Sequence, residues 1–443
     1  MQSMITVNSD SEYLSEAVFD HFLARHSELP QWLVNQKKKT WTDYLALPAP
    51  TRKMENWRFA NVMGLGVEGF RLAQAVTEED AQSLIEESKS VQNTSGKFVF
   101  ANDDLIAEEA ISGELKAKGV IFEPLERAFA KHSELLEEFF MAQESALGSE
   151  KFTALHTALN RNGTLLFVPE NLEIELPFVS HHWASGKESA VFPHTLVIAK
   201  DNSKLTFVDV YDSDEESAQL ACGVSTLYAG PGSNVEYHYV QTWNEASLSF
   251  NQLTTIAQRD SHIRAFGLNL GSKHARSEGH TIIDGPGSNA ELFSLTVAHE
   301  EQEMDQRTLQ SHNAANSRSD LLFKIALQDR SKTIFSGLIK VAEEAQQTDA
   351  YQTNRNLLLN PGAEANSLPG LEILANDVKC SHGATTGQID EDQLFYLLTR
   401  GISKATAQQL LVFGFFEEIL SKIGNKELAD YHRHLVHKKF ENS

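Results

Sequence analysis

Hydrophobic and polar positions follow a helical spacing at the start of the chain. In residues 11–47, Leu14, Val18 and Phe22 recur at the interval of one helix face, and Pro30 marks the start of a second helix. Residues 76–147 are again mostly helical in pattern and acidic, with the clearest helix over residues 123–147. The pattern predicts a mainly helical N-terminal domain over residues 1–150.

Near residue 163 the pattern changes to short runs rich in Val, Ile, Leu, Phe, Tyr and Thr. These runs are separated by Gly, Asn, Asp and Ser, as is typical of β-strands joined by turns, and they continue to about residue 385. Within them the segment Gly-Pro-Gly-Ser-Asn-Val-Glu at 230–236 recurs 55 residues later, with six of seven positions identical. The central part of the chain therefore contains an internal repeat.

Weaker turn signals at Ser203, Ser261 and Ser317 divide this interval, so that a turn occurs every 27 to 30 residues. A turn followed by strand-like runs at a constant period is typical of a solenoid, as in a parallel β-helix. The alternative is a β-sandwich or barrel with a chance repeat, but irregular sandwich loops are not expected to keep so constant an interval. We predict a parallel β-helix core over residues 155–388, in which the 55-residue repeat spans two turns.

Helical spacing returns over residues 389–443. Asp390 can cap a first helix that Gly401 ends, and Ser403 can cap a second helix that is apolar around most of its circumference. Its large apolar side chains include Phe413, Phe415 and Phe416. Two interpretations stay open for this helix: the core of a small C-terminal subdomain, or a docking surface for a partner.

The charge balance narrows the classes of partner. The chain of 443 residues has 61 acidic against 38 basic side chains and a formal charge of -23, which disfavours binding to nucleic acid or to an anionic membrane surface. The N-terminal sequence lacks a basic segment followed by an apolar core, and no window approaches the roughly 18 apolar residues of a membrane span. We therefore expect a cytoplasmic protein without a membrane span.

Common catalytic and metal-binding motifs are absent from the sequence. There is no phosphate-binding Gly-x-x-x-x-Gly-Lys-Ser/Thr loop, no dinucleotide-binding Gly-x-Gly-x-x-Gly after a strand, no Cys-x-x-Cys and no His-Glu-x-x-His. The chain should not hydrolyse ATP by itself. We interpret His181 with His182, His274 with His280, and the histidines of the last helix as surface polarity.

The two cysteines are far apart, and without an export signal they are expected to be free thiols. Cys222 lies between Ala221 and Gly223 and is predicted to be a small core residue. Cys380 stands two positions before His382, so in an extended segment both side chains share a face, and a run of turn-forming residues follows from Gly383. Thiolate and imidazole suit iron or an iron-sulfur cluster, but two ligands fall short of the roughly four that such sites use. A core cysteine beside a hydrogen-bonded histidine is the alternative.

Several segments resemble the SufB/SufD family of iron-sulfur cluster assembly proteins. They are Asp-Val-Lys-Cys-Ser-His-Gly-Ala-Thr at 377–385, Tyr-Leu-x-x-Arg-Gly-Ile at 396–402, Asn-Arg-Asn-Leu-Leu-Leu at 354–359 and the Pro-x-Arg-x-x-Glu-x-Trp element within 47–59. The small number of cysteines in the central region makes the chain more similar to the SufD branch than to the SufB branch.

This resemblance implies a mainly β fold, with a right-handed parallel β-helix between helical N-terminal and C-terminal domains. It implies pairing with a SufB-like subunit through the β-helix and docking of a SufC-like ATPase on the C-terminal domain, residues 389–443. Cys380 and His382 would lie at the SufB interface and hold iron in a transient, nascent iron-sulfur cluster, with His382 favoured. The implied docking residues are Arg400, Gly401, Phe413, Phe415 and Phe416.

The implied activity is that of a scaffold and not of an enzyme, because the SufC-like partner would hydrolyse the ATP. No permanently bound cofactor is expected. The rival from another class is a β-helix carbohydrate lyase or hydrolase that uses paired carboxylates on one face of the solenoid. A homodimer that pairs exposed β-helix edges is a third possibility when the chain is alone.

Overall fold

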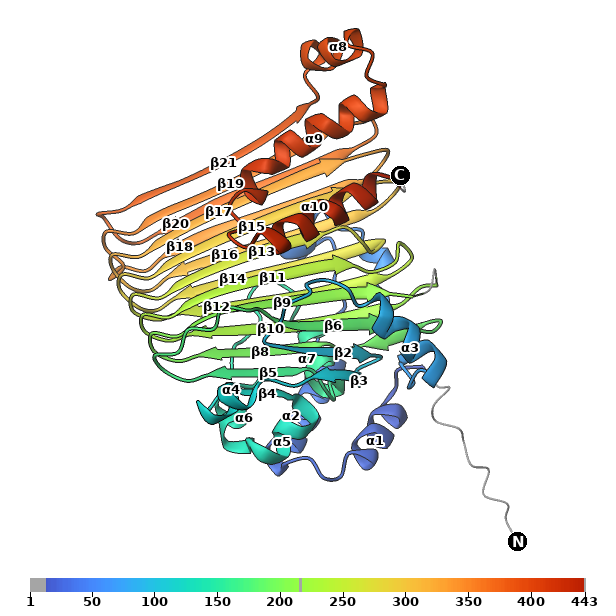
Figure 1. The fold of residues 1–443 in the computed structure, drawn as a ribbon, viewed down its shortest axis with the longest axis vertical. Coiled ribbons are helices and arrows are strands. Elements are labelled where there is room, and N and C mark those ends of the chain that lie inside the picture. The colour runs from blue at the N-terminus through green and yellow to red at the C-terminus, as the bar shows by residue number, and fades with distance from the viewer. Residues whose placement is uncertain (1–12, 215–216, 442–443) are drawn as a thin grey trace.

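The computed structural model describes residues 13–214 and 217–441 and forms a parallel β-solenoid with helices at both ends (Figure 1). Successive strands alternate between two sheets, so each turn of the solenoid adds one strand to each sheet. The predicted mainly β fold, with a parallel β-helix between helical segments, is confirmed.

We call the two layers sheet A and sheet B. Sheet A contains β5 (Thr164–Val168), β8 (His194–Ala199), β10 (Leu220–Ala229), β12 (Leu248–Ala257), β14 (His274–Ile283), β16 (Glu303–His312), β18 (Lys332–Val341) and β20 (Glu364–Ile373), with β7 (Ser189–Val191) beside β10. Sheet B contains β6 (Phe178–Ala184), β9 (Lys204–Ser213), β11 (Asn234–Thr242), β13 (His262–Asn269), β15 (Asn289–Ala298), β17 (Arg318–Leu327), β19 (Asp349–Leu358) and β21 (Lys379–Gln388). The solenoid core lies between the two sheets.

The turn serines that the sequence singled out recur at the same corner of the solenoid. Each is buried, precedes a strand of sheet B and donates its hydroxyl hydrogen to the carbonyl three residues earlier, over 2.6 to 2.9 Å; they are Ser203, Ser233, Ser261, Ser288 and Ser317. The strand register has the same interval, since Asn234 pairs with His262 and His262 with Asn289. The 55-residue repeat therefore spans two turns, as predicted.

A left-handed backbone position explains why the repeat spans two turns rather than one. Gly232 and Gly287 have φ of 68° and 76°, and a Cβ atom at either would clash with the side chain of the turn before it. Those neighbours, Asn202 and Asp260, hold φ of 54° and 56° at the equivalent position. Glycine thus alternates with Asn or Asp along this corner, because a side chain from one turn fills the space beside the next.

The N-terminal region is helical but also contributes strands to both sheets. β2 (Gly96–Ala101) and β3 (Asp104–Glu109) extend sheet B, β4 (Ile121–Pro124) extends sheet A, and β1 (Arg71–Leu72) pairs with β7. Its helices are α1 (Glu16–Arg25), α2 (Gln31–Ala46), α3 (Glu78–Glu87), α4 (Gly113–Ala117), α5 (Leu125–Lys131), α6 (Ser133–Phe139) and α7 (Glu150–Leu159). Pro30 begins α2 as predicted, whereas the helix expected over 123–147 is divided at His132 into α5 and α6.

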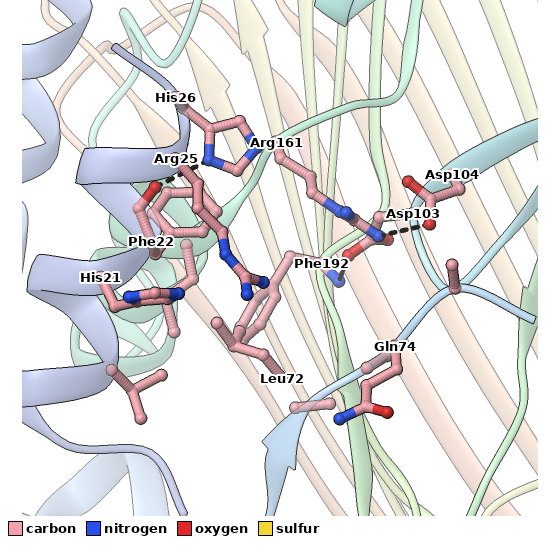
Figure 2. Close-up of a pocket in the computed structure, with 15 residues that line it drawn as sticks. His21, Phe22, Arg25, His26, Leu72, Gln74, Asp103, Asp104, Arg161 and Phe192 are labelled. Carbon is pink, nitrogen blue, oxygen red and sulfur yellow. Dashed lines mark hydrogen bonds and ion pairs between the residues drawn. The ribbon is translucent and has the colours of Figure 1, made fainter. Parts of the chain in front are cut away.

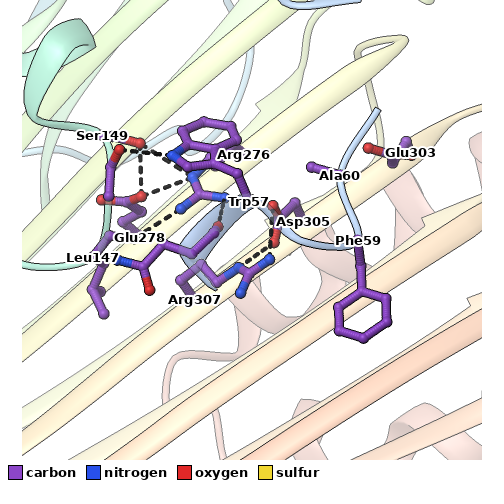
Figure 3. Close-up of polar contacts among 12 residues, drawn as sticks. Trp57, Phe59, Ala60, Leu147, Ser149, Arg276, Glu278, Glu303, Asp305 and Arg307 are labelled. Carbon is purple, nitrogen blue, oxygen red and sulfur yellow. Dashed lines mark hydrogen bonds and ion pairs between the residues drawn. The ribbon is translucent and has the colours of Figure 1, made fainter. Parts of the chain in front are cut away.

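A buried ionic network joins the N-terminal region to the outer face of sheet A (Figure 3). The Arg276 guanidinium lies 3.7 Å from the Trp57 ring centre and forms ion pairs with Glu278 at 2.8 Å and Asp305 at 2.5 Å. The Trp57 indole donates a hydrogen bond to the Gly148 carbonyl over 3.0 Å. These contacts attach the Pro-x-Arg-x-x-Glu-x-Trp element to the solenoid.

Replacing Trp57 by alanine should destabilise the chain by about 3 to 5 kcal/mol, because it opens a cavity and removes the aromatic face from a buried guanidinium. The urea midpoint of unfolding measures this change. The Trp57→Phe variant should lose much less, and Met63→Ala, at a side chain that is 94% exposed, should change almost nothing. A Trp57→Ala midpoint equal to that of the parent chain would contradict the proposed role of this contact.

The C-terminal helices are α8 (Glu391–Thr399), α9 (Lys404–Leu420) and α10 (Lys426–Glu441). Asp390 caps α8 and Ser403 caps α9 through their side-chain oxygens, as predicted. Helices α9 and α10 lie on the outer face of sheet B, whereas α8 lies beyond the last strands (Figure 1). None of the helices in residues 13–214 and 217–441 is long and apolar enough to cross a membrane.

Candidate functional site at the open end of the solenoid

The last turn of the solenoid, made by β20 and β21, ends both sheets. In the described part of the chain β20 pairs with β18 and β21 pairs with β19, and neither strand has a neighbour on its other side. Both strands are ten residues long; β21 is largely exposed, whereas β20 is half-buried over most of its length. Unpaired edges of this length present a row of backbone donors and acceptors to another chain.

Cys380 and His382 lie together on β21, on the face that continues the solenoid core. They pair in register with Ala350 and Gln352 of β19, both of which are buried. His382 is exposed at the open end. Gly383, where a turn was expected, lies within β21, because the strand continues to Gln388. The prediction that the two side chains share a face is therefore confirmed, and the prediction of a turn from Gly383 is wrong.

Cys380 is half-buried and packs against a small apolar cluster that includes Val341 and Ala350. Burial raises the pKa of its thiol; the Ala350 backbone opposes this effect, and the charge of Asp349 adds to it. A raised pKa leaves less of the thiolate that binds metal. Of the two side chains, His382 is thus the more accessible ligand in the isolated chain.

Buried amide side chains form a polar layer beneath the last turn. Asn354 and Asn356 of β19 hydrogen bond to each other over 2.9 Å, and Ser367 of β20 donates to Asn354 over 2.7 Å. Gln352, directly under His382 in the register, donates to the Gly337 carbonyl over 3.3 Å. The sequence analysis assigned these residues no place in the site. The alternation of Asn354 and Asn356 around Arg355 could have indicated that the core-facing side of this strand is polar.

Arg400 and Gly401 end α8 next to the open end. Gly401 has φ of 81° and donates its amide hydrogen to the Leu398 carbonyl over 3.0 Å, so it terminates the helix as predicted. The Arg400 guanidinium lies over the Tyr396 ring, 5.1 Å from its centre. Both residues are exposed.

The three phenylalanines of α9 do not form one exposed surface. Phe416 is fully buried against sheet B together with Phe293 and Leu322, and Phe413 stacks on His437 with ring centres 3.7 Å apart. Phe415 is half-buried and lies beside Lys324. The core that these side chains complete belongs to the solenoid face rather than to a separate C-terminal subdomain.

The exposed apolar surface near the open end lies instead on α8. Phe395 is 67% exposed, Tyr396 57% and Leu398 38%. The sequence predicted the two ends of α8 but did not predict this surface.

Most of the histidines interpreted as surface polarity are buried or half-buried. His181 and His182 are buried on β6, and His432 is buried where α10 packs on sheet B. In residues 13–214 and 217–441 no three or more His, Cys, Asp or Glu side chains gather to hold a metal ion. Cys222 is a buried packing residue, as predicted, although it faces the N-terminal helices and not the solenoid interior.

Comparison with known proteins identifies the family. The model described as "SUF system FeS cluster assembly, SufBD core domain" matches residues 182–415, and the model "SufBD protein N-terminal region" matches residues 17–178. The chain belongs to the SufBD family. Among its relatives, the iron-sulfur cluster assembly protein SufD of Bacillus subtilis is 30% identical over 94% of both chains, and SufD of Escherichia coli is 27% identical over 86% of both. A SufBD family protein of Staphylococcus saprophyticus is 22% identical over 93% of this chain and 90% of its own length.

The carbohydrate-active alternative gains no support from the outer face of sheet A of this SufBD chain. Glu278 and Asp305 are a neighbouring pair of carboxylates there, but both are buried and ion-paired with Arg276. A glycosidase needs one such carboxyl group as an acid and the other as a base or nucleophile, both open to the sugar. This pair serves to hold the N-terminal region instead.

Proposed function

We propose that the chain is a non-catalytic scaffold subunit of the SUF iron-sulfur assembly machinery, in which a nascent cluster forms at the open end of the solenoid. The observation that carries this proposal is strand β21, which pairs only with β19 in the described chain and presents exposed His382 and half-buried Cys380 at the open end. Membership of the SufBD family supports a role in this assembly system.

The partner proposed at this end is a SufB-like subunit. The unpaired edges of β20 and β21 can continue into a second solenoid by backbone pairing, which supplies affinity without special side chains. Leu371, Ile373 and Leu374 are exposed beside these edges and would be covered by such a partner. A second copy of this chain offers the same edges, so a homodimer is the competing occupant.

Iron and sulfide are the cargo of this site. Cys380 and His382 offer one sulfur and one nitrogen ligand on the same face of one strand, and iron-sulfur clusters use about four ligands. The remaining ligands would come from the partner chain. A half-site of this kind binds cargo only when the two subunits are together, and it releases cargo when they separate.

An ATPase of the SufC type is proposed to dock on α8, where Phe395 and Tyr396 are exposed beside Arg400. Movement of these helices would reach the site through Glu418 of α9. Glu418 pairs with Lys324 of β17 at 2.5 Å and with Arg355 of β19 at 3.1 Å. Since β19 is the only neighbour of β21 in the described chain, a pull on α9 would act on the strand that supports His382.

The direct test is co-expression of the chain with SufB-like and SufC-like subunits, followed by affinity purification. All three should co-purify, and the chain alone should sediment as a monomer or homodimer with no ATPase activity. Recovery of neither partner would overturn the proposal. Sedimentation of the purified complex then distinguishes a mixed dimer from a dimer of two identical chains.

Replacing both Phe395 and Tyr396 by serine should weaken binding of the SufC-like ATPase by about tenfold or more, because interface energy concentrates in a few large side chains. The pairing with the SufB-like subunit should be unchanged, since β20 and β21 are not altered. The affinity of each variant for the SufC-like ATPase, measured with the ATPase immobilised on a sensor surface, tests this expectation. The matched control is Met63→Ser, which removes an exposed apolar side chain from a distant part of the chain.

A further inference from the structure

The glutamine beneath His382 has a buried oxygen atom that makes no hydrogen bond. Gln352 of β19 is 1% exposed, and its Nε2 atom donates to the Gly337 carbonyl of β18 over 3.3 Å. Its Oε1 atom is buried without a hydrogen-bond partner in the part of the chain that the structure describes. A buried amide oxygen without a partner costs free energy, so a group that donates to it would stabilise the open end of the solenoid.

A glycine on the opposite sheet makes room for this amide group. Gly337 belongs to sheet A and Gln352 to sheet B, so the side chain of Gln352 crosses the interior of the solenoid. A Cβ atom at position 337 would lie only 2.5 Å from both the Nε2 and the Oε1 atom of Gln352. The amide group therefore rests directly on the glycine backbone, and any larger residue at 337 would displace it.

His382 is the next side chain above Gln352 in the stack of strands. The two residues are paired in register on neighbouring parallel strands, so their side chains project from the same face and their backbones lie about 4.8 Å apart. His382 is exposed, so its ring can rotate without displacing packed side chains. This spacing lets a side-chain rotation bring a ring nitrogen of His382 to the unpaired oxygen of Gln352.

The chemistry of a histidine ligand gives this oxygen a use. A neutral imidazole has one nitrogen that carries a hydrogen and one nitrogen with a free lone pair, and only the second can bind a metal ion. Histidines that bind metal usually donate the hydrogen of the other nitrogen to a nearby acceptor, which fixes the tautomer and the orientation of the ring. The Oε1 atom of Gln352 is an amide oxygen, and it accepts hydrogen bonds as a backbone carbonyl does.

We propose that Gln352 is the positioning residue of the half-site. Its Oε1 atom accepts the hydrogen of one ring nitrogen of His382, so the other ring nitrogen presents its lone pair to iron. Gly337 supports this role by holding the amide group of Gln352 in place. The inference rests on the cluster site proposed above and deepens it, because it names the group that orients the exposed ligand of that site.

Variants of these two residues, purified with the SufB-like and SufC-like subunits, test the inference through the iron and sulfide content of the complex. Gln352→Leu removes the acceptor and should lower cluster content about tenfold, since the loss of a group that orients a metal ligand commonly costs 10- to 100-fold. Gln352→Glu keeps an oxygen acceptor at the same reach and should retain most of the content. Gly337→Ala should act like Gln352→Leu, because it displaces the amide group. Full cluster content in Gln352→Leu, or equal losses in Gln352→Leu and Gln352→Glu, would overturn the inference.

A double variant separates a positioning role from a structural one. When His382→Ala is already present, Gln352→Leu should lower cluster content no further, because the side chain that it orients is gone. A further loss of similar size would show that Gln352 acts on the fold and not through His382. Low content in His382→Ala with full content in Gln352→Leu would refute this inference alone, whereas full content in His382→Ala would refute the cluster site itself.

Two controls make the same substitution at other glutamines. Gln306 of β16 is also buried in the solenoid interior, where its amide donates to Ser294 over 3.3 Å and to Thr296 over 3.2 Å, and Gln306→Leu should leave cluster content unchanged. Gln74 is exposed beside the cavity between α1 and the first turns of the solenoid (Figure 2), so Gln74→Leu is the surface control. A loss in Gln306→Leu as large as that in Gln352→Leu would show that any buried amide of the interior has this effect, and would refute the specific role of Gln352.

Discussion

The His382→Ala variant is expected to form the complex with SufB-like and SufC-like subunits but to accumulate iron-sulfur cluster at least about tenfold more slowly or less completely. His382 is the exposed ligand of the half-site and lies on a strand that is largely exposed, so the fold should not depend on its side chain. Removing a metal ligand, or even a group that only orients one, commonly lowers metal affinity 10- to 100-fold. Cluster content of the purified complex, measured by its visible absorption and by iron and sulfide analysis, gives the result.

Two variants on the same strand make this experiment specific. Lys379→Ala removes an exposed side chain that points to the opposite face of β21, and it should leave cluster content unchanged. Cys380→Ser should have a smaller effect than His382→Ala as long as the thiol stays half-buried with a raised pKa. Full cluster content in His382→Ala, with the complex intact, would refute the assignment of this residue.

The solenoid could be predicted because its turns repeat a local requirement. Each corner needs a residue that tolerates positive φ, followed by a serine that donates to the carbonyl three positions back, as at Gly232 and Ser233. These needs are met by neighbouring residues, so they leave a periodic trace in the sequence. The shared face of Cys380 and His382 was predictable for the same reason, because it depends only on the two-residue period of a strand.

The environment of the outer faces was not predictable in this way. His181 and His432 were expected at the surface, and each stands next to a polar residue, His182 and Arg433, in the sequence. They are buried because α3 and α10, which are remote in sequence, lie over the outer face of sheet B. The same distant packing buries Phe416 and leaves Phe395 exposed. Which helix covers which strand depends on tertiary packing and leaves no periodic signal along either segment.

Strand β19 takes part both in the repeating solenoid turns and in the packing of a distant helix on the outer face. Its inner face carries Asn354 and Asn356, which belong to the polar layer under the last turn, and its outer face carries Arg355, which pairs with Glu418 of α9. One strand thus contacts both the proposed cluster site and the helix that leads to the proposed ATPase surface. A change in the position of α9 would therefore shift β19, the strand that pairs with the strand of His382, without any rearrangement of the solenoid turns.

Acid should destabilise the fold steeply, because many histidines are held neutral inside it. Burial lowers the pKa of His156 and His432 to about 3 and that of His312 to about 4, from an ordinary value of 6.5, and it lowers those of His181 and His194 well below this value. The unfolded chain takes up these protons near its ordinary pKa, whereas the folded chain does not. Stability is therefore complete above that value and is lost as the pH falls through it.

Two carboxyl groups oppose this trend over part of the range. Burial raises the pKa of Asp103 and Asp212 to about 6 from 3.8, so between these values the folded chain keeps protons that the unfolded chain has released. The protons that these two carboxyl groups keep in the folded chain offset the protons that two of the five histidines take up in the unfolded chain. The free energy of unfolding should therefore fall as the pH drops toward 5, and each buried histidine that is not offset contributes about 1.4 kcal/mol per pH unit.

Urea unfolding of the chain at several pH values between neutral and about pH 5 measures this slope. The His432→Gln variant should reduce the slope by about 1.4 kcal/mol per pH unit, because it removes one of the buried titrating groups. His434→Gln is the matched control on the same helix, because it makes the same substitution at an exposed side chain. A free energy of unfolding that stays constant or rises as the pH falls toward 5 would show that these histidines are protonated in the folded chain.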